Sequence, residues 1–329
     1  MKNTKLKKIL VVVLSVVLFI FVLREILVVL EPKTEHGVRQ ARCLYAQPRD
    51  TIDVCFMGSS HAHCNINTKI LWDDYGIAAY DYSAAEQPLW ITYYYLYELL
   101  KNQKPRLIVL DMYAPARFEE DYQYRWLPDN LNGIRFSRNK YEMAKVSCEA
   151  EVLNDYFPSF FNFHTRYDEI GMEDIKELFK TDDERKAFKG YTPYYYVAPL
   201  EKPDFDVNGY KEISDKSKIY LNKIIELVEE NEIELSFIVT PYYVTSEDEA
   251  VYNFLKDYCE NKGYPFCDYN REYDEIGLDF SKDFNDYSHL NYDGGIKFTK
   301  YLAEEIKGEY DIPDRRGLKE WESWERQVY

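Results

Sequence analysis

Two short motifs near opposite ends of the sequence carry residues that could act together as a nucleophile and its base. The first is Gly58-Ser59-Ser60-His61, and the second is Asp286-Tyr287-Ser288-His289. A serine at the start of a helix lies near backbone N–H groups, which favour developing negative charge on a neighbouring oxygen. An aspartate three residues before a histidine can hold the Nδ1 proton, so that Nε2 is free to accept the serine proton. The pattern predicts acyl-transfer chemistry at Ser60, His289 and Asp286.

Each motif also has a simpler interpretation. Ser60 could cap the helix that follows it, and Asp286 with His289 could form a local cap at a helix start. A third interpretation is a metal site at His61, His63 and Cys64, completed by Asp286 or His289. We predict no metal and no organic cofactor, because the possible ligands come from one short turn and no carboxylate motif supports them.

The elements around these motifs predict an α/β domain. Short apolar runs bounded by turn residues indicate buried strands, and helical patterns lie between them. The predicted strands are 51–57, 77–82, 106–112, 234–239 and 265–268, and the predicted helices are 68–74, 88–101, 214–230, 247–261 and 293–307. This alternation predicts a parallel sheet covered by helices on both faces. Ligands bind beyond the carboxyl ends of such strands, where the Ser60 motif follows the first one.

The N-terminal segment predicts an uncleaved membrane anchor. Four lysines within residues 1–8 precede an apolar stretch over residues 9–30, which is about 33 Å of helix. No small-residue cleavage pattern follows this stretch, so a signal peptide is disfavoured. The lysines place residues 1–8 in the cytoplasm, which predicts a single-pass protein of the cell membrane with an extracellular domain. A buried amphipathic helix is the alternative.

Composition excludes several classes of protein. The chain has 329 residues, with 41 Lys+Arg against 58 Asp+Glu and a formal net charge of −17. Such a negative field disfavours nucleic acid as a partner, and it opposes binding to anionic polymers. The six cysteines are widely scattered without a C-x-x-C pair, which is typical of core thiols rather than a zinc knuckle.

Together, the two motifs resemble the SGNH (GDSL-type) hydrolase family. The similarity is greatest to its membrane-anchored branch, which includes teichoic-acid D-alanylation and polysaccharide O-acetyltransferase proteins. Gly58-Ser59-Ser60 would be the first block and Asp286-x-x-His289 the last. The resemblance implies a three-layer α/β/α sandwich of the flavodoxin-like kind, with about five parallel strands after the one transmembrane helix. It also implies Ser60 as nucleophile, His289 as general base and Asp286 as its orienting carboxylate.

Two blocks depart from the pattern of that family. Its second block supplies a glycine and its third an asparagine, but this chain has Ser83-Ala84-Ala85-Glu86-Gln87 and Asp111-Met112-Tyr113. We therefore expect the Ser60 N–H, the Ala85 N–H and the Gln87 amide to share the oxyanion hole.

The remaining segments are interpreted from their composition. Residues 31–50 are expected to be a juxtamembrane linker, and residues 51–310 the catalytic domain. A Tyr- and Asp-rich insertion at about 113–210 interrupts that domain, and residues 311–329 form an acidic tail, expected to be a peripheral flap. Substrate contacts are expected from His61, Tyr113, His164 and Arg166, although a buried histidine–aspartate pairing is an alternative for His164.

These features predict an outward-facing serine esterase or O-acyltransferase. Its substrate would be a cell-surface polysaccharide or another acylated glycan, and a membrane-bound acyltransferase is a candidate partner. The same triad serves water and sugar acceptors, so the acceptor stays open. The alternative is a catalytically inactive surface protein of this fold, which binds glycan or assembles polysaccharide-modifying machinery.

Overall fold

A parallel sheet forms the centre of the computed structural model, which describes residues 2–117 and 122–329. Position 1 of the predicted cytoplasmic segment and positions 118–121 of the predicted insertion lie outside the described residues. The strands are β1 (Val54–Met57), β2 (Ala79–Asp81), β3 (Leu107–Asp111), β4 (Glu234–Val239) and β5 (Phe266–Asp268). Their order in the sheet is β2-β1-β3-β4-β5, and each neighbouring pair is parallel. The predicted parallel sheet is thus confirmed.

The strands form because most of their side chains are apolar on both faces, with an aspartate ending β2, β3 and β5. All residues of β1, β2 and β3 are buried, and β4 is exposed only at Glu234. Such continuous apolar runs are typical of parallel strands covered on both sides. Register is shared across the sheet, since Val54 of β1 pairs with Ala79 of β2 and with Leu107 of β3.

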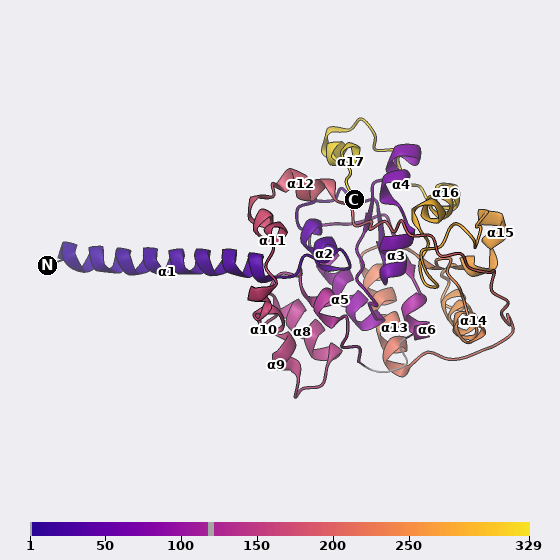
Figure 1. The fold of residues 1–329 in the computed structure, drawn as a ribbon, viewed down its shortest axis with the longest axis horizontal. Helices are drawn as coiled ribbons and strands as arrows, with labels where there is room; N and C mark the ends of the chain where they lie inside the picture. The colour runs from indigo at the N-terminus through magenta and orange to yellow at the C-terminus, as the bar shows by residue number, and fades with distance from the viewer. Residues whose placement is uncertain (1, 118–121) are drawn as a thin grey trace.

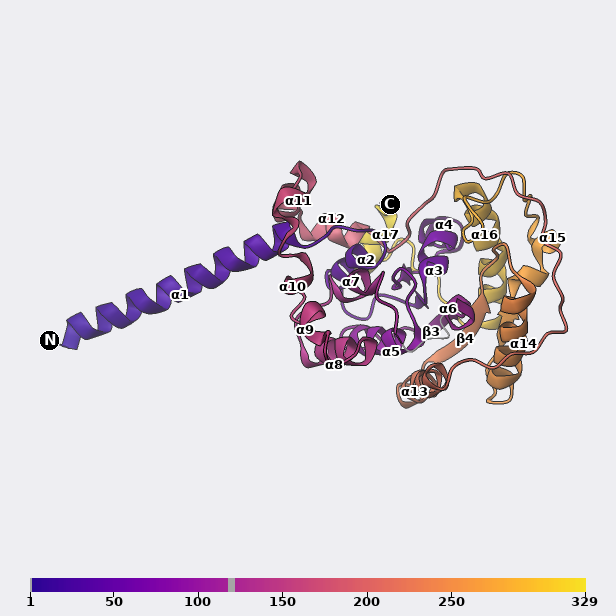
Figure 2. The same ribbon diagram turned by 60° about the horizontal axis from the view of Figure 1, so that its bottom comes forward.

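Helices cover both faces of this sheet (Figures 1 and 2). Before β3 the helices are α1 (Lys2–Leu30), α2 (Val38–Leu44), α3 (Ser60–Asn65), α4 (Thr68–Tyr75) and α5 (Leu89–Leu99). After the insertion they are α13 (Asp215–Glu230), α14 (Ser246–Glu260), α15 (Tyr273–Ile276), α16 (Tyr292–Glu309) and α17 (Glu322–Glu325), with the 3-10 turns η3 (Tyr269–Arg271) and η4 (Lys319–Trp321). Helix α4 contacts α16, and α5 contacts α13. Figure 2 shows these two pairs on opposite sides of β3 and β4, so the three-layer α/β/α arrangement is confirmed.

The region from β3 to α13 consists of short helices. They are α6 (Tyr113–Arg117), α7 (Leu127–Leu131), α8 (Arg138–Ser147), α9 (Leu153–Tyr156), α10 (Phe160–Phe163), α11 (Met172–Lys176) and α12 (Asp182–Ala187), with η1 (Arg166–Asp168) and η2 (Glu177–Phe179). Helix α8 packs against α5 of the central domain, so part of this region covers the sheet rather than standing apart from it.

Helix α1 projects away from the rest of the molecule (Figure 1). Within the described residues it is the one helix long and apolar enough to cross a membrane, over Lys5–Leu30. Its side chains are exposed along most of that length, which distinguishes it from the core helix of a soluble domain.

Residues 31–50 are more than the linker expected from the sequence. They contain α2, whose Ala41 and Leu44 are buried in the main hydrophobic core. The Tyr80 hydroxyl of β2 donates to the Gln40 carbonyl at 2.7 Å. Because these contacts are buried, the segment is an integral part of the domain.

The C-terminal tail also belongs to the core, so the expected peripheral flap is wrong. Trp324 is fully buried and its ring lies 6.2 Å from that of Trp72. The Arg315 guanidinium donates to both carboxylate oxygens of Asp53, at 2.7 and 2.9 Å. Burial of a large aromatic side chain outweighs the solubility of the acidic residues around it.

The cysteines are free thiols, as expected. Cys267 is half-buried and the other five are buried.

Candidate active site

The turn after β1 places Ser60 at the carboxyl edge of the sheet, between the strands where the chain order reverses. Gly58 has a φ of 131°, and a Cβ added there would lie 2.8 Å from the carbonyl oxygen of Asp111 at the end of β3. Only glycine allows this close approach and this backbone conformation. Ser59 then caps α3 by accepting from the His61 N–H, and Ser60 is the first residue of that helix.

The structure brings Ser60, His289 and Asp286 into one hydrogen-bonded chain, although 229 positions separate the serine from the histidine. Ser60 Oγ lies 2.9 Å from His289 Nε2. His289 Nδ1 lies 3.1 Å from Asp286 Oδ1 and 3.2 Å from Oδ2. This order of atoms lets a carboxylate orient the imidazole while Nε2 faces the hydroxyl.

The Asp286 carboxylate is held in its charged form. Burial alone would raise its pKa, but hydrogen bonds from His289 and the Ser288 N–H lower the pKa well below its usual range. The Ser288 and His289 N–H groups donate to Oδ1 at 2.7 and 2.9 Å, and the Asn285 amide donates to Oδ2 at 2.8 Å. The carboxylate therefore also shapes the turn that carries His289.

Asn65 ties the histidine turn to the serine helix. Its Oδ1 accepts from the Leu290 N–H at 3.0 Å, directly after His289, and its Nδ2 donates to Thr240 Oγ1 at 3.1 Å. Asn65 is fully buried at the end of α3. Sequence reasoning missed this residue, because a single asparagine carries no signal of a contact 225 positions away.

Two of the three expected oxyanion donors are engaged elsewhere. The Ala85 N–H donates to the His36 carbonyl at 2.8 Å, so the structure contradicts Ala85 as a donor. The Gln87 side chain is fully buried and its Nε2 donates to Thr92 Oγ1 at 3.2 Å. The first contact results from the packing of residues 34–37 on the loop after β2, and the second is a local contact with the start of α5. The Ser60 N–H, at the start of α3, remains the candidate donor of the three.

His61 and Tyr113 line the same edge of the sheet, as expected for residues near a substrate. Their rings stack at 3.5 Å, and the His61 ring lies 5.3 Å from that of His289. His61 is fully buried, and burial together with His289 and Arg117 holds its pKa well below the usual range. Its Nδ1 lies 3.4 Å from Thr240 Oγ1, while Nε2 has no hydrogen-bond partner within the described residues. His61 is thus a neutral imidazole with one ring nitrogen available.

His164 and Arg166 lie outside this site, so the structure contradicts their expected substrate contacts. His164 is exposed and its Nδ1 lies 2.9 Å from the Phe161 carbonyl, which also excludes a buried pairing with an aspartate. Arg166 donates to the Leu30 carbonyl at 2.6 Å and pairs with Asp174 at 3.4 Å. Both residues follow α10, which folds against the end of α1.

His36 is an unexpected neighbour of the site. Its Nδ1 lies 3.1 Å from His63 Nε2, and its Nε2 lies 3.5 Å from the Tyr194 hydroxyl. The Tyr194 ring in turn lies 5.3 Å from that of His289. His36 falls within residues 31–50, which were expected to be a juxtamembrane linker, since nothing in the local pattern predicts that residues 34–37 fold back onto the sheet edge.

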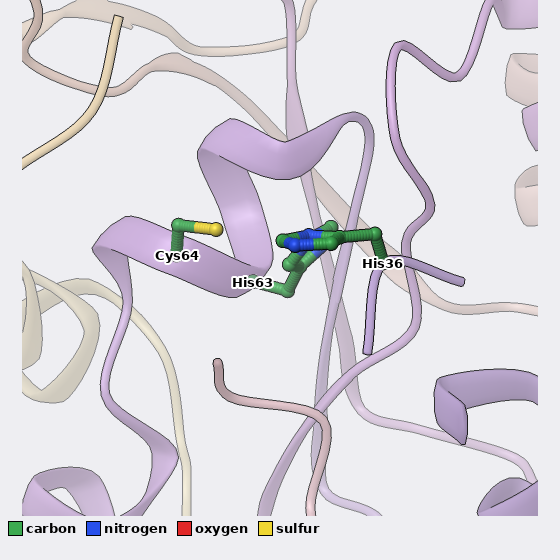
Figure 3. Close-up of side chains that lie close together, drawn as sticks. All are labelled: His36, His63 and Cys64. Atoms are coloured by element: carbon green, nitrogen blue, oxygen red, sulfur yellow. The ribbon is translucent and has the colours of Figure 1, made fainter. Parts of the chain in front are cut away.

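The contact between His36 and His63 changes which residues could form the alternative metal site. His61 Nδ1 faces Thr240 and His63 Nε2 faces His36, so the expected ligand set does not converge. Instead, ligand atoms of His36, His63 and Cys64 lie within 4.8 Å of one another. Figure 3 shows the two imidazole rings together, with the Cys64 sulfur turned toward them. Burial raises the pKa of the Cys64 thiol well above its usual value, and the two rings already satisfy each other. We interpret this cluster as a hydrogen-bonded wall of the site.

Comparisons with known proteins give a distant structural likeness and no match in sequence. No family model matches the chain, and no curated protein matches it. A crystal structure of a Bacteroides fragilis protein, provisionally described as an acylhydrolase, aligns with a TM-score of 0.41 and 13% identity. The alignment covers 84% of this chain and 99% of that one. A likeness this distant assigns neither family nor activity, so function is argued below from the site itself.

Proposed function

We propose that the protein is a serine esterase or O-acyltransferase of the SGNH type. The observation that carries this proposal is the hydrogen-bonded chain from Ser60 Oγ through His289 to Asp286 at the carboxyl edge of β1. In flavodoxin-like sheets this edge is where ligands bind. A carboxylate, an imidazole and a hydroxyl in this order form the general arrangement of an activated serine.

The reaction would proceed in two transfers. Ser60 Oγ attacks the acyl carbon of an ester while His289 Nε2 takes the hydroxyl proton. The tetrahedral oxyanion forms near the Ser60 N–H, and the alcohol leaves with the proton from His289. Water or a sugar hydroxyl then attacks the acyl-enzyme and gives its proton to His289 Nε2. His289 returns this proton to Ser60 Oγ as the bond between Oγ and the acyl carbon breaks.

The substrate we favour is an acylated glycan at the cell surface. Helix α1 would anchor the protein by a single pass with residues 1–8 in the cytoplasm, so that the domain faces outward. A formal charge of −17 favours neutral polysaccharides over anionic ones. A membrane-bound acyltransferase could supply the acyl group to such an enzyme.

Labelling and turnover of the full-length protein in detergent test the proposal. We expect a fluorophosphonate probe to label the wild type, and p-nitrophenyl acetate to be hydrolysed. Ser60→Ala and His289→Ala should each abolish labelling and reduce turnover by about 10³-fold or more. His164→Ala is the matched control, because this exposed histidine lies outside the site and its loss should leave both readouts unchanged.

The second candidate is a catalytically inactive protein that binds glycan. It is favoured by the engagement of the Ala85 N–H and the Gln87 amide away from the serine, which weakens the oxyanion hole. A folded wild-type protein that neither reacts with the probe nor hydrolyses the ester would establish this candidate instead.

A further inference from the structure

Exposed apolar side chains gather in residues 136–179, at the end of the domain where α1 enters it. Phe136, Tyr167, Met172 and Phe179 are 76%, 73%, 67% and 78% exposed. With the less exposed members, the set that we name the membrane-proximal rim is Phe136, Phe161, Tyr167, Met172, Ile175 and Phe179. Soluble surfaces seldom expose so many large apolar side chains in one region, and such clusters mark interaction sites.

The elements that carry most of the rim lie beside the last turn of α1. Figures 1 and 2 both show α10 and α11 beside that end of the helix, and α1 contacts α11 and η2. Polar contacts fix the junction: Arg166 donates to the Leu30 carbonyl at 2.6 Å, and the Gly133 N–H donates to Glu31 Oε1 at 3.0 Å. The orientation of α1 relative to the rim is therefore set by the fold.

The length of the apolar part of α1 determines how close the bilayer lies to the domain. Ile9–Leu23 contains 15 residues, or about 22 Å of helix, whereas the hydrocarbon core is about 30 Å thick. About 20 residues are needed, which extends the span from Ile9 to Val28. Leu27 and Val28 already lie against the domain, so lipid chains must reach the level of the rim. Arg24 and Glu25 would then extend toward the headgroups from within the last turns.

A cavity of about 490 Å³ lies at the same level. Its walls include Leu27 and Val28 of α1 together with Phe136, Phe160 and Phe163. Its charged lining consists of Arg24, Arg42, Arg135, Lys140 and Arg185 with the acidic Glu31 and Asp182, so basic side chains outnumber acidic ones there. Arg42 pairs with Glu31, and Arg185 pairs with Glu177. Apolar walls beside guanidinium groups match the two parts of a phospholipid, an acyl chain and a phosphate.

From these observations we propose that the membrane-proximal rim inserts into the leaflet on the domain's side, with the cavity filled by a lipid of that leaflet. This inference rests on the part of the proposed function in which α1 spans the membrane. It adds that the domain lies directly on the bilayer at a fixed tilt. The catalytic proposal does not depend on it.

Tryptophan quenching in nanodiscs tests this placement on the full-length chain. The discs contain phosphatidylcholine and phosphatidylglycerol with brominated acyl chains, and emission is compared with non-brominated discs. Phe161→Trp and Phe179→Trp report on the rim. Phe21→Trp within α1 is the positive control, and Tyr210→Trp, whose parent ring packs on Phe254 of the distant helix α14, is the negative control.

We expect the added emission of the two rim variants to be quenched like that of Phe21→Trp, while that of Tyr210→Trp is not. Quenching of Phe21→Trp without quenching at the rim would overturn the proposal, and it would leave the rim to a protein partner. A lack of quenching at Phe21→Trp would also overturn it, because the anchor would then lie outside the bilayer. Ester hydrolysis by the same samples separates either failure from failure of the catalytic proposal.

Discussion

The Asp286 carboxylate has two roles: it stabilises the backbone turn that carries His289, and it orients the His289 ring. One oxygen accepts from the backbone N–H groups of Ser288 and His289, which holds the turn. The carboxylate also faces His289 Nδ1, which sets the tautomer of the imidazole. A substitution that preserves the turn but changes the tautomer can separate the two roles.

Asp286→Asn is that substitution. The amide oxygen can still accept from the backbone, but the amide NH₂ would donate to His289 Nδ1 and so place the proton on Nε2. An imidazole in that form cannot accept the Ser60 proton, and we expect turnover to fall by about 10³- to 10⁴-fold with little change in thermal stability. The exposed Asp293→Asn is the control, with activity retained. Wild-type turnover in Asp286→Asn would mean that the carboxylate only shapes the turn.

Asp111 makes the stability of the domain depend on pH. Burial raises the pKa of this carboxyl to about 7, although the N–H groups of Thr240 and Tyr113 counteract the shift. Between about pH 4 and pH 7 the folded protein keeps a proton that the unfolded chain has released. The free energy of unfolding should therefore fall as pH rises through this window, by about 1.4 kcal/mol per pH unit from this group alone.

Chemical denaturation of wild type and Asp111→Asn at a series of pH values measures this contribution. Other groups titrate equally in both proteins, so the difference between the two slopes isolates Asp111. Parallel slopes would show that the carboxyl titrates at its ordinary value in the folded state.

At the scale of elements, the strands were predictable and the four-residue helices were not. The predicted strand 234–239 has the bounds of β4, and each other predicted strand contains an observed one. Buried parallel strands are recognisable because they are continuous apolar runs between turn residues. Helices such as α9 and α10 have four residues each, which is too short for an amphipathic period to appear.

The candidate site was predictable only where its residues carry local signals. Ser60 and His289 stand in recognisable motifs, and the alternation of elements placed them at related positions. His36 and Asn65 enter the site through packing between distant segments, and no local pattern indicates such contacts. The prediction that the Ala85 N–H belongs to the oxyanion hole failed for the same reason, since the acceptor of this N–H comes from residues before α2.

The junction of α3 with the histidine turn should control turnover through Asn65. Asn65→Ala leaves the buried Leu290 N–H and Thr240 hydroxyl without this partner, which costs about 1–3 kcal/mol per group. We expect a lower melting temperature and a fall in kcat with little change in KM, because His289 loses its position relative to Ser60. Steady-state kinetics and thermal unfolding measure both effects.

Asn67→Ala provides the matched control for that variant. Asn67 caps α4, and loss of the cap should cost about 1 kcal/mol of stability while leaving kcat unchanged. Equal effects of both substitutions on kcat would remove Asn65 from its positioning role.

At the scale of the whole molecule, the domain begins earlier and ends later than the sequence suggests. Helix α2 is built into the core, and the tail returns to it through Trp324. Both ends of the domain also contact Phe188. Val328 forms a β-bridge with it, and the guanidinium of Arg39 lies over its ring, 3.9 Å from the centroid. The folded domain therefore extends from about residue 32 to residue 329.

Two truncated proteins test this boundary. Removal of residues 1–32 deletes the projecting helix and the contacts that Leu30 and Glu31 make with the domain, but it keeps α2. It should leave a soluble protein with a cooperative thermal transition. Removal of residues 1–50 also deletes α2, whose Val38, Ala41, Cys43 and Leu44 are buried. Burial of Val38 and Leu44 contributes about 1.5–3 kcal/mol each, which together approaches the lower end of the net stability of a domain. We expect the shorter protein to unfold or aggregate, and similar melting temperatures for both would contradict this assignment.

The distance along the chain between Ser60 and His289 bears on when during export the two residues can meet. In the topology proposed above, the chain would be anchored at its N-terminus and exported in order, so Ser60 would emerge early and His289 would follow 229 residues later. Until then the Ser60 hydroxyl would have no base, so a half-exported chain of the proposed enzyme would not form an acyl-enzyme. A serine-directed probe applied to growing cells should consequently mark finished molecules and pass over those still in transit.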